Sequence, residues 1–244
     1  MALEPDNRFE LRTGRMTAGE AAAAEIDVGL RQYMLNIYNY MASGLTLTGI
    51  VAYGASTSET LMQAIMGTPL MWVVMLSPFA FILALSFGIH KMKASTAQAV
   101  FWGFSAVMGL SLAYIFLIYT GASITRVFFI SAGTFAGMSL YGYTTKKDLT
   151  GWGSFLYMGL FGIIIAMVVN MFLQSSAMHF VISVIGVLVF VGLTAYDTQK
   201  IKNIYRQADT GEMQSKKAIM GALTLYLDFL NLFLMLLRLF GERR

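Results

Sequence analysis

The chain has 244 residues, of which 57% are hydrophobic and 12% are charged, about half the charge content of a typical soluble domain. The net charge of +4 comes from basic residues beside the ends of apolar segments, so we expect contact with anionic lipid and no nucleic-acid partner. The absence of cysteine excludes disulfides, thiolate metal sites and thiol catalysis.

Seven segments are long and apolar enough to cross a bilayer, which takes about 20 residues in a helix. Short connections join the first six, which predicts an all-α integral membrane protein in which residues 32–244 form one bundle. Residues 1–31 are polar, lack the apolar core of a secretory signal and are predicted to form a cytoplasmic N-terminal arm. The predicted spans are 33–53, 70–89, 99–119, 124–143, 152–173, 178–196 and 218–240.

Basic residues predict the orientation of this bundle. Most of the 17 Lys and Arg residues lie in the N-terminal arm and in the second, fourth and sixth connections. The excess of positive charge on cytoplasmic loops therefore places the N-terminus in the cytoplasm and the C-terminus outside.

Three local features in and beside the middle spans each lead to a separate prediction. Pro78 lies inside the second span and is expected to bend it, with a role in a pore as the less favoured reading. Gly133 and Gly137 form a GxxxG pattern, which is typical of closely packed membrane helices. His90 follows the second span beside Lys91, and we interpret it as an interfacial residue and not as a metal ligand.

The sixth span ends in VGLTAYDTQKIKNIYRQ, which contains no helix-breaking residue and is predicted to continue as a helix into the cytoplasm. Asp197 would then lie at the inner membrane border, with Lys200 one turn further along. One reading is a solvated carboxylate paired with Lys200. The other is a carboxylate that needs a bound cation, a shared proton or a nearby Arg or Lys, because the C-terminal end of a helix disfavours negative charge.

Asp228 lies in the middle of the last span, where a carboxylate costs about 2.5–3.5 kcal/mol to insert. It belongs to a polar stripe at helical spacing, which comprises Lys217, Gly221, Thr224, Asp228, Asn231, Met235 and Arg238. Asp228 is therefore either a buried carboxylate hydrogen-bonded by Asn231, Thr224 or a neighbouring helix, or a functional group.

Three classes of function fit these residues. The first is a cation pathway in which Asp197 and Asp228 share a proton and can bind Ca²⁺, which prefers oxygen ligands. The second, a remote alternative, is an intramembrane aspartyl protease, but the last span reads LYLDF and lacks a GxGD signature, so no enzyme is expected. The third is a regulatory membrane protein that binds and modulates a partner such as a membrane protease.

The blocks YDTQKI at 196–201 and LYLDFLNLFLMLLRLFG at 225–241 resemble the Bax inhibitor family, especially its bacterial members. The resemblance covers all seven spans and implies a bacterial inner-membrane protein whose seventh helix is wrapped by the other six. It also implies a pH-sensitive calcium leak through Asp197 and Asp228, with Ca²⁺ as the permeant ion and no tightly bound cofactor. Two features depart from the family: the second span has no charge before His90 and Lys91, and the polar stretch at 207–215 is expected to lengthen the loop between the two aspartates.

Overall fold

The computed structural model describes residues 18–244, with side chains described from residue 28 onward, and these residues form an all-α fold. The prediction of an all-helical protein is therefore confirmed. In chain order the helices are α1 (Ala18–Ser56), α2 (Glu59–Met66), α3 (Leu70–Gly88), α4 (Ala94–Leu112), α5 (Ile115–Ile118), α6 (Gly121–Thr144), α7 (Thr150–Leu173), α8 (Ser176–Ile204) and α9 (Gly211–Phe240).

Six helical segments of the described chain are long and apolar enough to cross a membrane: α3, α4 with α5, α6, α7, α8 and α9. They coincide with the second to seventh predicted spans. The first predicted span, 33–53, lies within α1, which is helical over this whole range but is not among the six. Part of the predicted N-terminal arm is helical too, because α1 begins at Ala18; residues 1–17 lie outside the described residues.

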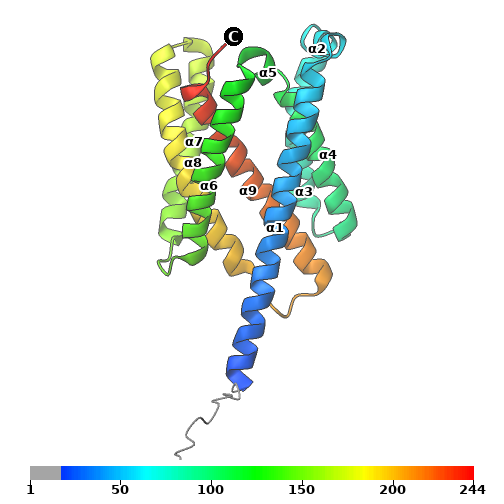
Figure 1. Cartoon of the computed structure of the whole chain (residues 1–244), viewed down its shortest axis with the longest axis vertical. Coiled ribbons are helices and arrows are strands. Elements are labelled where there is room, and N and C mark those ends of the chain that lie inside the picture. Colours follow the sequence, from blue (N-terminus) through cyan, green and yellow to red (C-terminus); the bar gives the residue numbers. More distant parts are fainter. Residues whose placement is uncertain (1–17) are drawn as a thin grey trace, which may run out of the picture.

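Helix α9 runs obliquely through the middle of the bundle (Figure 1). It packs against α8, α1, α6 and α4, and 72% of the residues in its apolar stretch are buried, compared with 11% for α3. A helix that is apolar on nearly all sides is expected in a core. Within the polar stripe of α9, Gly221, Asp228 and Met235 are buried, whereas Arg238 at its end is exposed.

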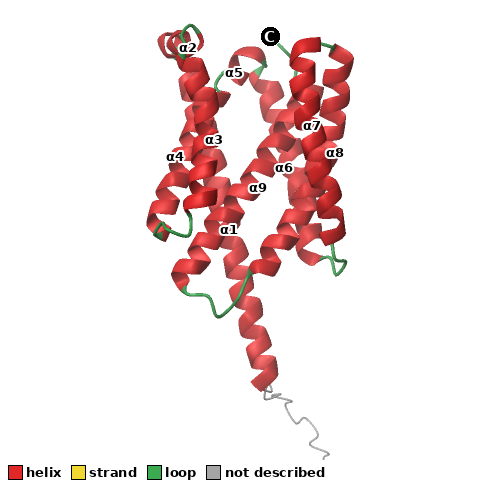
Figure 2. Cartoon of the chain, turned by 180° about the vertical axis from the view of Figure 1, so that it is seen from behind, coloured by secondary structure: helices red, strands yellow, loops and turns green. Residues whose placement is uncertain are grey.

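The remaining helices form two groups on either side of α9 (Figures 1 and 2). One group packs α1 and α3 against α4, and the other packs α6 and α7 against α8. Their outer surfaces carry exposed large apolar side chains, such as Phe79, Phe129 and Phe172. Such surfaces are expected to face lipid.

Pro78 lies within α3, and its effect on the helix is compensated by packing. Proline cannot donate to the carbonyl four residues earlier, which belongs to Val74. That carbonyl oxygen instead lies 2.6 Å from Ser111 Oγ of α4 and 3.0 Å from Ser77 Oγ, and both hydroxyls are placed to donate to it. The free carbonyl of Val74 thus links α3 to α4 through Ser111, and the bend at Pro78 stays a prediction.

The predicted close contact at Gly133 and Gly137 is wrong. A Cβ atom added at either position would have open space within 4 Å. The close approach of α6 occurs instead at Gly142, where an added Cβ would lie 2.2 Å from the carbonyl oxygen of Ala195 on α8. The partner atoms are the backbone of Ala195, which lies on a different helix, so no spacing within one segment of the sequence marks this contact.

The last residues fix the end of the bundle opposite the α8–α9 connection. The Thr120 amide donates to the Glu242 carbonyl at 3.0 Å, and the Arg244 amide donates to the Ile118 carbonyl at 2.9 Å. The Glu242 amide donates to Ser123 Oγ at 2.9 Å. These bonds attach the C-terminal end of α9 to the α5–α6 connection.

Candidate functional site

Asp197 on α8 and Asp228 on α9 meet at the contact between these two helices. Their carboxyl groups lie within hydrogen-bonding reach of one another, and the residues are only 2% and 6% exposed. The structure therefore brings together the two carboxylates that the sequence singled out. It does so because α8 continues unbroken to Ile204, as predicted, and Asp197 belongs to a helix that packs along α9.

The reading of Asp197 as a solvated carboxylate paired with Lys200 is wrong. Asp197 is buried, and no ion pair within 4 Å links it to Lys200 in the described part of the chain. Lys200 Nζ instead lies 5.9 Å from the ring centroids of both Tyr157 and Tyr196, a distance at which a cation is attracted to an aromatic ring.

Tyr157 on α7 is part of the site and was not found from the sequence. Its hydroxyl donates a hydrogen bond to Asp197 Oδ1 at 3.2 Å. Its ring also packs edge-on against Tyr196, with centroids 5.9 Å apart. One signal in the sequence could have indicated it. Tyr157 lies deeper in the span than Trp152, which already occupies the interfacial position at that end.

Asp228 has a buried carboxylate oxygen, Oδ2, that accepts no hydrogen bond. The neighbours proposed to satisfy it bond within their own helix: Asn231 Nδ2 donates to the Leu227 carbonyl at 2.8 Å, and Thr224 Oγ1 donates to the Met220 carbonyl at 3.1 Å. Neither residue therefore satisfies Asp228, and the group that the neighbouring helix α8 places beside it is the carboxyl group of Asp197. A buried unpaired carboxylate is costly, and a proton held between two close carboxylates removes that cost.

A cavity of about 380 Å³ opens beside Asp197. Residues named from the sequence line it: Asp197, Lys200 and His90, together with three members of the polar stripe of α9, Lys217, Gly221 and Thr224. His90 follows α3, far from Asp197 in sequence, and the fold brings it to this wall. Asn231 and Asp228 are not lining residues; Asp228 lies behind Asp197 on the buried side.

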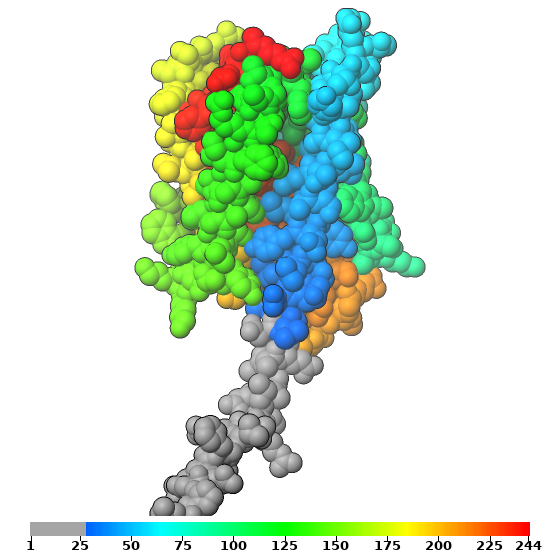
Figure 3. All heavy atoms as spheres, viewed as in Figure 1, coloured from blue at the N-terminus to red at the C-terminus, as the bar shows by residue number. Residues whose placement is uncertain are grey.

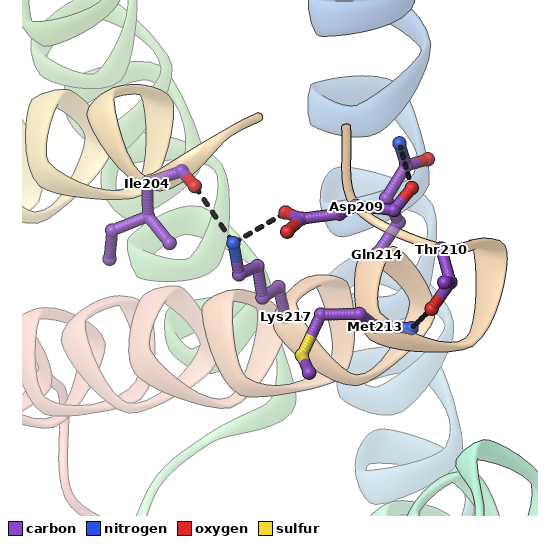
Figure 4. Close-up of polar contacts among 6 residues, drawn as sticks. All are labelled: Ile204, Asp209, Thr210, Met213, Gln214 and Lys217. Carbon is purple, nitrogen blue, oxygen red and sulfur yellow. Dashed lines mark hydrogen bonds and ion pairs between the residues drawn. The ribbon is translucent and has the colours of Figure 1, made fainter. Parts of the chain in front are cut away.

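The α8–α9 connection is held at the rim of this cavity (Figure 4). Lys217 Nζ pairs with Asp209 at 2.5 Å and donates to the Ile204 carbonyl at 3.1 Å. Thr210 Oγ1 accepts from the Met213 amide and so caps α9. The prediction of a long loop over 207–215 is wrong, because α8 ends at Ile204 and α9 begins at Gly211, so residues 211–215 already belong to α9. The short connection that remains is fixed to the first turns of α9.

Cation binding at the site would depend on the two aspartates. Within residues 28–244, no three His, Asp or Glu side chains gather in an arrangement that could hold a metal ion. Two carboxylates supply fewer oxygens than the roughly six to eight that Ca²⁺ takes in tight sites. The chemistry of the pair suits proton sharing and brief cation contact better than storage of a metal.

A family model described as "Inhibitor of apoptosis-promoting Bax1" matches residues 30–244. The chain belongs to the Bax inhibitor family. This confirms the resemblance seen in the two sequence blocks, and the family region contains both aspartates, Tyr157 and the cavity.

Relatives match over nearly their whole length. The chain is 50% identical over 218 residues to "Uncharacterized protein RP147" of Rickettsia prowazekii, covering 89% of this chain and 92% of that protein. It is 48% identical over 219 residues to "Inner membrane protein YbhL" of Escherichia coli strain K12, covering 88% and 94%. A Caulobacter vibrioides protein is 42% identical over 253 residues, covering 98% and 99%. The Bax inhibitor family member described here is thus similar to a protein of the bacterial inner membrane.

Proposed function

We propose that this protein is a proton-sensitive calcium leak of the bacterial inner membrane, gated by Asp197 and Asp228. One observation carries the proposal: two buried carboxyl groups from adjacent helices lie within hydrogen-bonding reach, and one of their oxygens has no other partner. Such a pair holds a proton in common, and its charge changes when that proton leaves.

Loss of the shared proton would change the packing of α8 on α9. Two ionised carboxylates repel one another strongly in a buried site, where little water screens them. Because Asp197 borders the cavity and Asp228 lies behind it on the central helix, separation of the two side chains would extend the cavity toward the middle of the bundle. A cation entering this space would then meet carboxylate oxygens.

The proposal includes seven spans and a defined orientation. Helix α1 packs along α4 and α9, which are both candidate spans, and so is placed to cross with them. With the N-terminus in the cytoplasm and the C-terminus outside, the cavity and the α8–α9 connection face the cytoplasm. Lys200, Lys216 and Lys217 at the cavity then follow the positive-inside rule.

Calcium flux into dye-loaded proteoliposomes, measured from about pH 5 to about pH 8, tests the proposal. The intact protein is expected to give flux above empty vesicles with a clear pH dependence, which Asp228→Asn removes while keeping the shape of the side chain. The control is Asp148→Asn, which removes an exposed carboxylate from the α6–α7 connection. Flux equal to that of empty vesicles at every pH would overturn the channel proposal, and copurification would then test regulation of a membrane partner.

Tyr157→Phe is expected to keep calcium flux but to move the midpoint of its pH response upward. The hydroxyl of Tyr157 donates to Asp197, and a hydrogen bond to a carboxylate favours the charged form. Its loss would keep the pair protonated to a higher pH. The measurement is the same flux assay, with Tyr53→Phe as the control because that exposed tyrosine lies in the last turn of α1, where its ring packs against Phe116. An unchanged midpoint would show that Tyr157 does not act on the pair.

A further inference from the structure

Helix α1 carries a row of uncharged polar side chains on its exposed side, which we call the α1 polar seam. Its members are alternately four and three residues apart, the spacing of one helix face that contacts a neighbouring helix. All of them are exposed in the single chain. The seam consists of Gln32, Asn36, Asn39, Ser43 and Thr46.

The hydrogen bonds that these side chains make in the described structure stay within α1. Gln32 Nε2 donates to Asn36 Oδ1 at 3.0 Å, and Ser43 Oγ donates to the Asn39 carbonyl at 2.5 Å. Thr46 Oγ1 donates to the Ala42 carbonyl at 2.8 Å. Amide groups that face lipid without further partners are unfavourable, because hydrocarbon offers no hydrogen bonds.

All members of the seam except Thr46 line one wall of a groove of about 590 Å³. The other walls include Trp102 of α4 and Gln214 and Ser215 of α9, and no charged side chain of the described residues lines it. Figure 3 shows that α1 lies uncovered at the surface of the molecule. At a rise of about 1.5 Å per residue, the seam runs on the order of 20 Å along the helix, deeper than a lipid headgroup reaches. Its occupant is therefore a helix and not a headgroup.

We propose that the α1 polar seam is the interface between two copies of this protein. Two copies inserted with the same orientation are related by a twofold axis along the membrane normal, so their α1 helices run parallel and residues of the same number meet. Such an interface needs side chains that can bond to copies of themselves. Asn, Gln, Ser and Thr each carry both a donor and an acceptor, and they have no charge to repel across the axis.

The amide side chains also specify how the two α1 helices of the dimer are aligned. A polar Asn in the seam between two parallel helices bonds to its counterpart only when the helices are aligned. Asn36 and Asn39 occupy successive positions of the seam, so both can pair only in one alignment. This inference does not depend on calcium conduction, since it rests on α1 and not on the aspartate pair.

Cysteine crosslinking tests the interface, because the native chain contains no cysteine. Asn36→Cys and Asn39→Cys are each made as single-cysteine proteins in liposomes and oxidised at two lipid-to-protein ratios. The control is Leu140→Cys on α6, a residue that is 63% exposed and follows Ser139, whose hydroxyl contacts Tyr38 of α1 and so lies at the depth of the seam. We expect at least about tenfold more disulfide-linked dimer at the seam than at Leu140, and no decrease on dilution with lipid. Equal linkage at all three positions, or none at the seam, would overturn the proposal.

Asn39→Arg provides a second measurement that needs no crosslink. It places two guanidinium groups opposite one another, which stay charged and cannot share a proton as two close carboxyl groups can, so the dimer fraction by light scattering is expected to fall about tenfold. Asn39→Ser, which keeps a donor and an acceptor, is expected to retain the dimer. A dimer fraction unchanged by Asn39→Arg in protein with a normal melting curve would also overturn the interface.

Discussion

Gly142→Ala is expected to destabilise the purified protein by about 3 kcal/mol, which corresponds to a melting temperature lower by roughly 10 °C. The new Cβ would lie 2.2 Å from the carbonyl oxygen of Ala195 and 2.9 Å from its carbonyl carbon and Cα. These are backbone atoms, which cannot rotate away as a side chain can. Helices α6 and α8 would therefore have to separate.

Separation at Gly142 would also reach the site. One turn away, Ser139 Oγ lies 3.0 Å from Thr198 Oγ1 and 2.5 Å from Tyr38 Oη, so these bonds join α6 to α8 and α1. Thr198 directly follows Asp197 in the chain. The substitution is thus expected to disturb the aspartate pair as well as the stability of the bundle.

Thermal unfolding in detergent, followed by tryptophan fluorescence, measures this effect. Gly133→Ala is the matched control, because it lies on the same helix and an added Cβ meets nothing within 4 Å. Alanine favours a helix over glycine by about 1 kcal/mol, so the control is expected to be neutral or slightly stabilising. Equal melting temperatures for the two variants would contradict the close α6–α8 contact.

The aspartate pair could be predicted from the sequence because charge is rare in apolar helices. Asp228 is conspicuous at the centre of a span, and Asp197 follows from the unbroken helical pattern beyond the sixth span. Their contact depended on the order of helices in the bundle, which the sequence does not specify. The same holds for His90, whose place in the cavity requires the end of α3 to face α8 and α9.

Tyr157 and Gly142 show why other parts of the fold could not be predicted. A tyrosine near the end of a span usually anchors the helix at the interface, so its residue type did not distinguish Tyr157 from Tyr143 or Tyr119. The GxxxG pattern identified Gly133 and Gly137 as small, but spacing alone does not say which face of a helix meets another. Gly142 meets the backbone of Ala195 on another helix, and the pairing of residues between helices has no pattern within one segment of the sequence.

There is also a physical reason why the first predicted span, 33–53, is not among the six candidate spans. The α1 polar seam lowers the hydropathy of the 33–53 segment, which explains why α1 is the one predicted span that is not strongly apolar. A helix inside a bundle or between two copies tolerates polar residues that a lipid-facing helix does not. The low hydropathy of α1 thus agrees with contacts to α4, α9 and a second copy.

Asp197→Asn and Asp228→Asn are expected to have effects on calcium flux that do not add. A proton shared by two close carboxyl groups belongs to the pair, so removing either carboxyl abolishes both the sharing and the repulsion. Each single variant is expected to reduce a flux change of about tenfold between low and neutral pH to less than about twofold. The double variant should then behave like either single variant, because nothing of the pair remains to be lost.

The proteoliposome assay with all four proteins forms a double-mutant cycle that measures this coupling. Asn231→Ala is the control, since Asn231 is a polar residue of α9 that bonds to its own helix and does not line the cavity. Combined with Asp197→Asn, it should give independent effects. If the two aspartate substitutions instead changed the pH response by separate factors that multiply, each carboxyl would titrate alone, and a gate based on a shared proton would be excluded even if the protein conducts calcium.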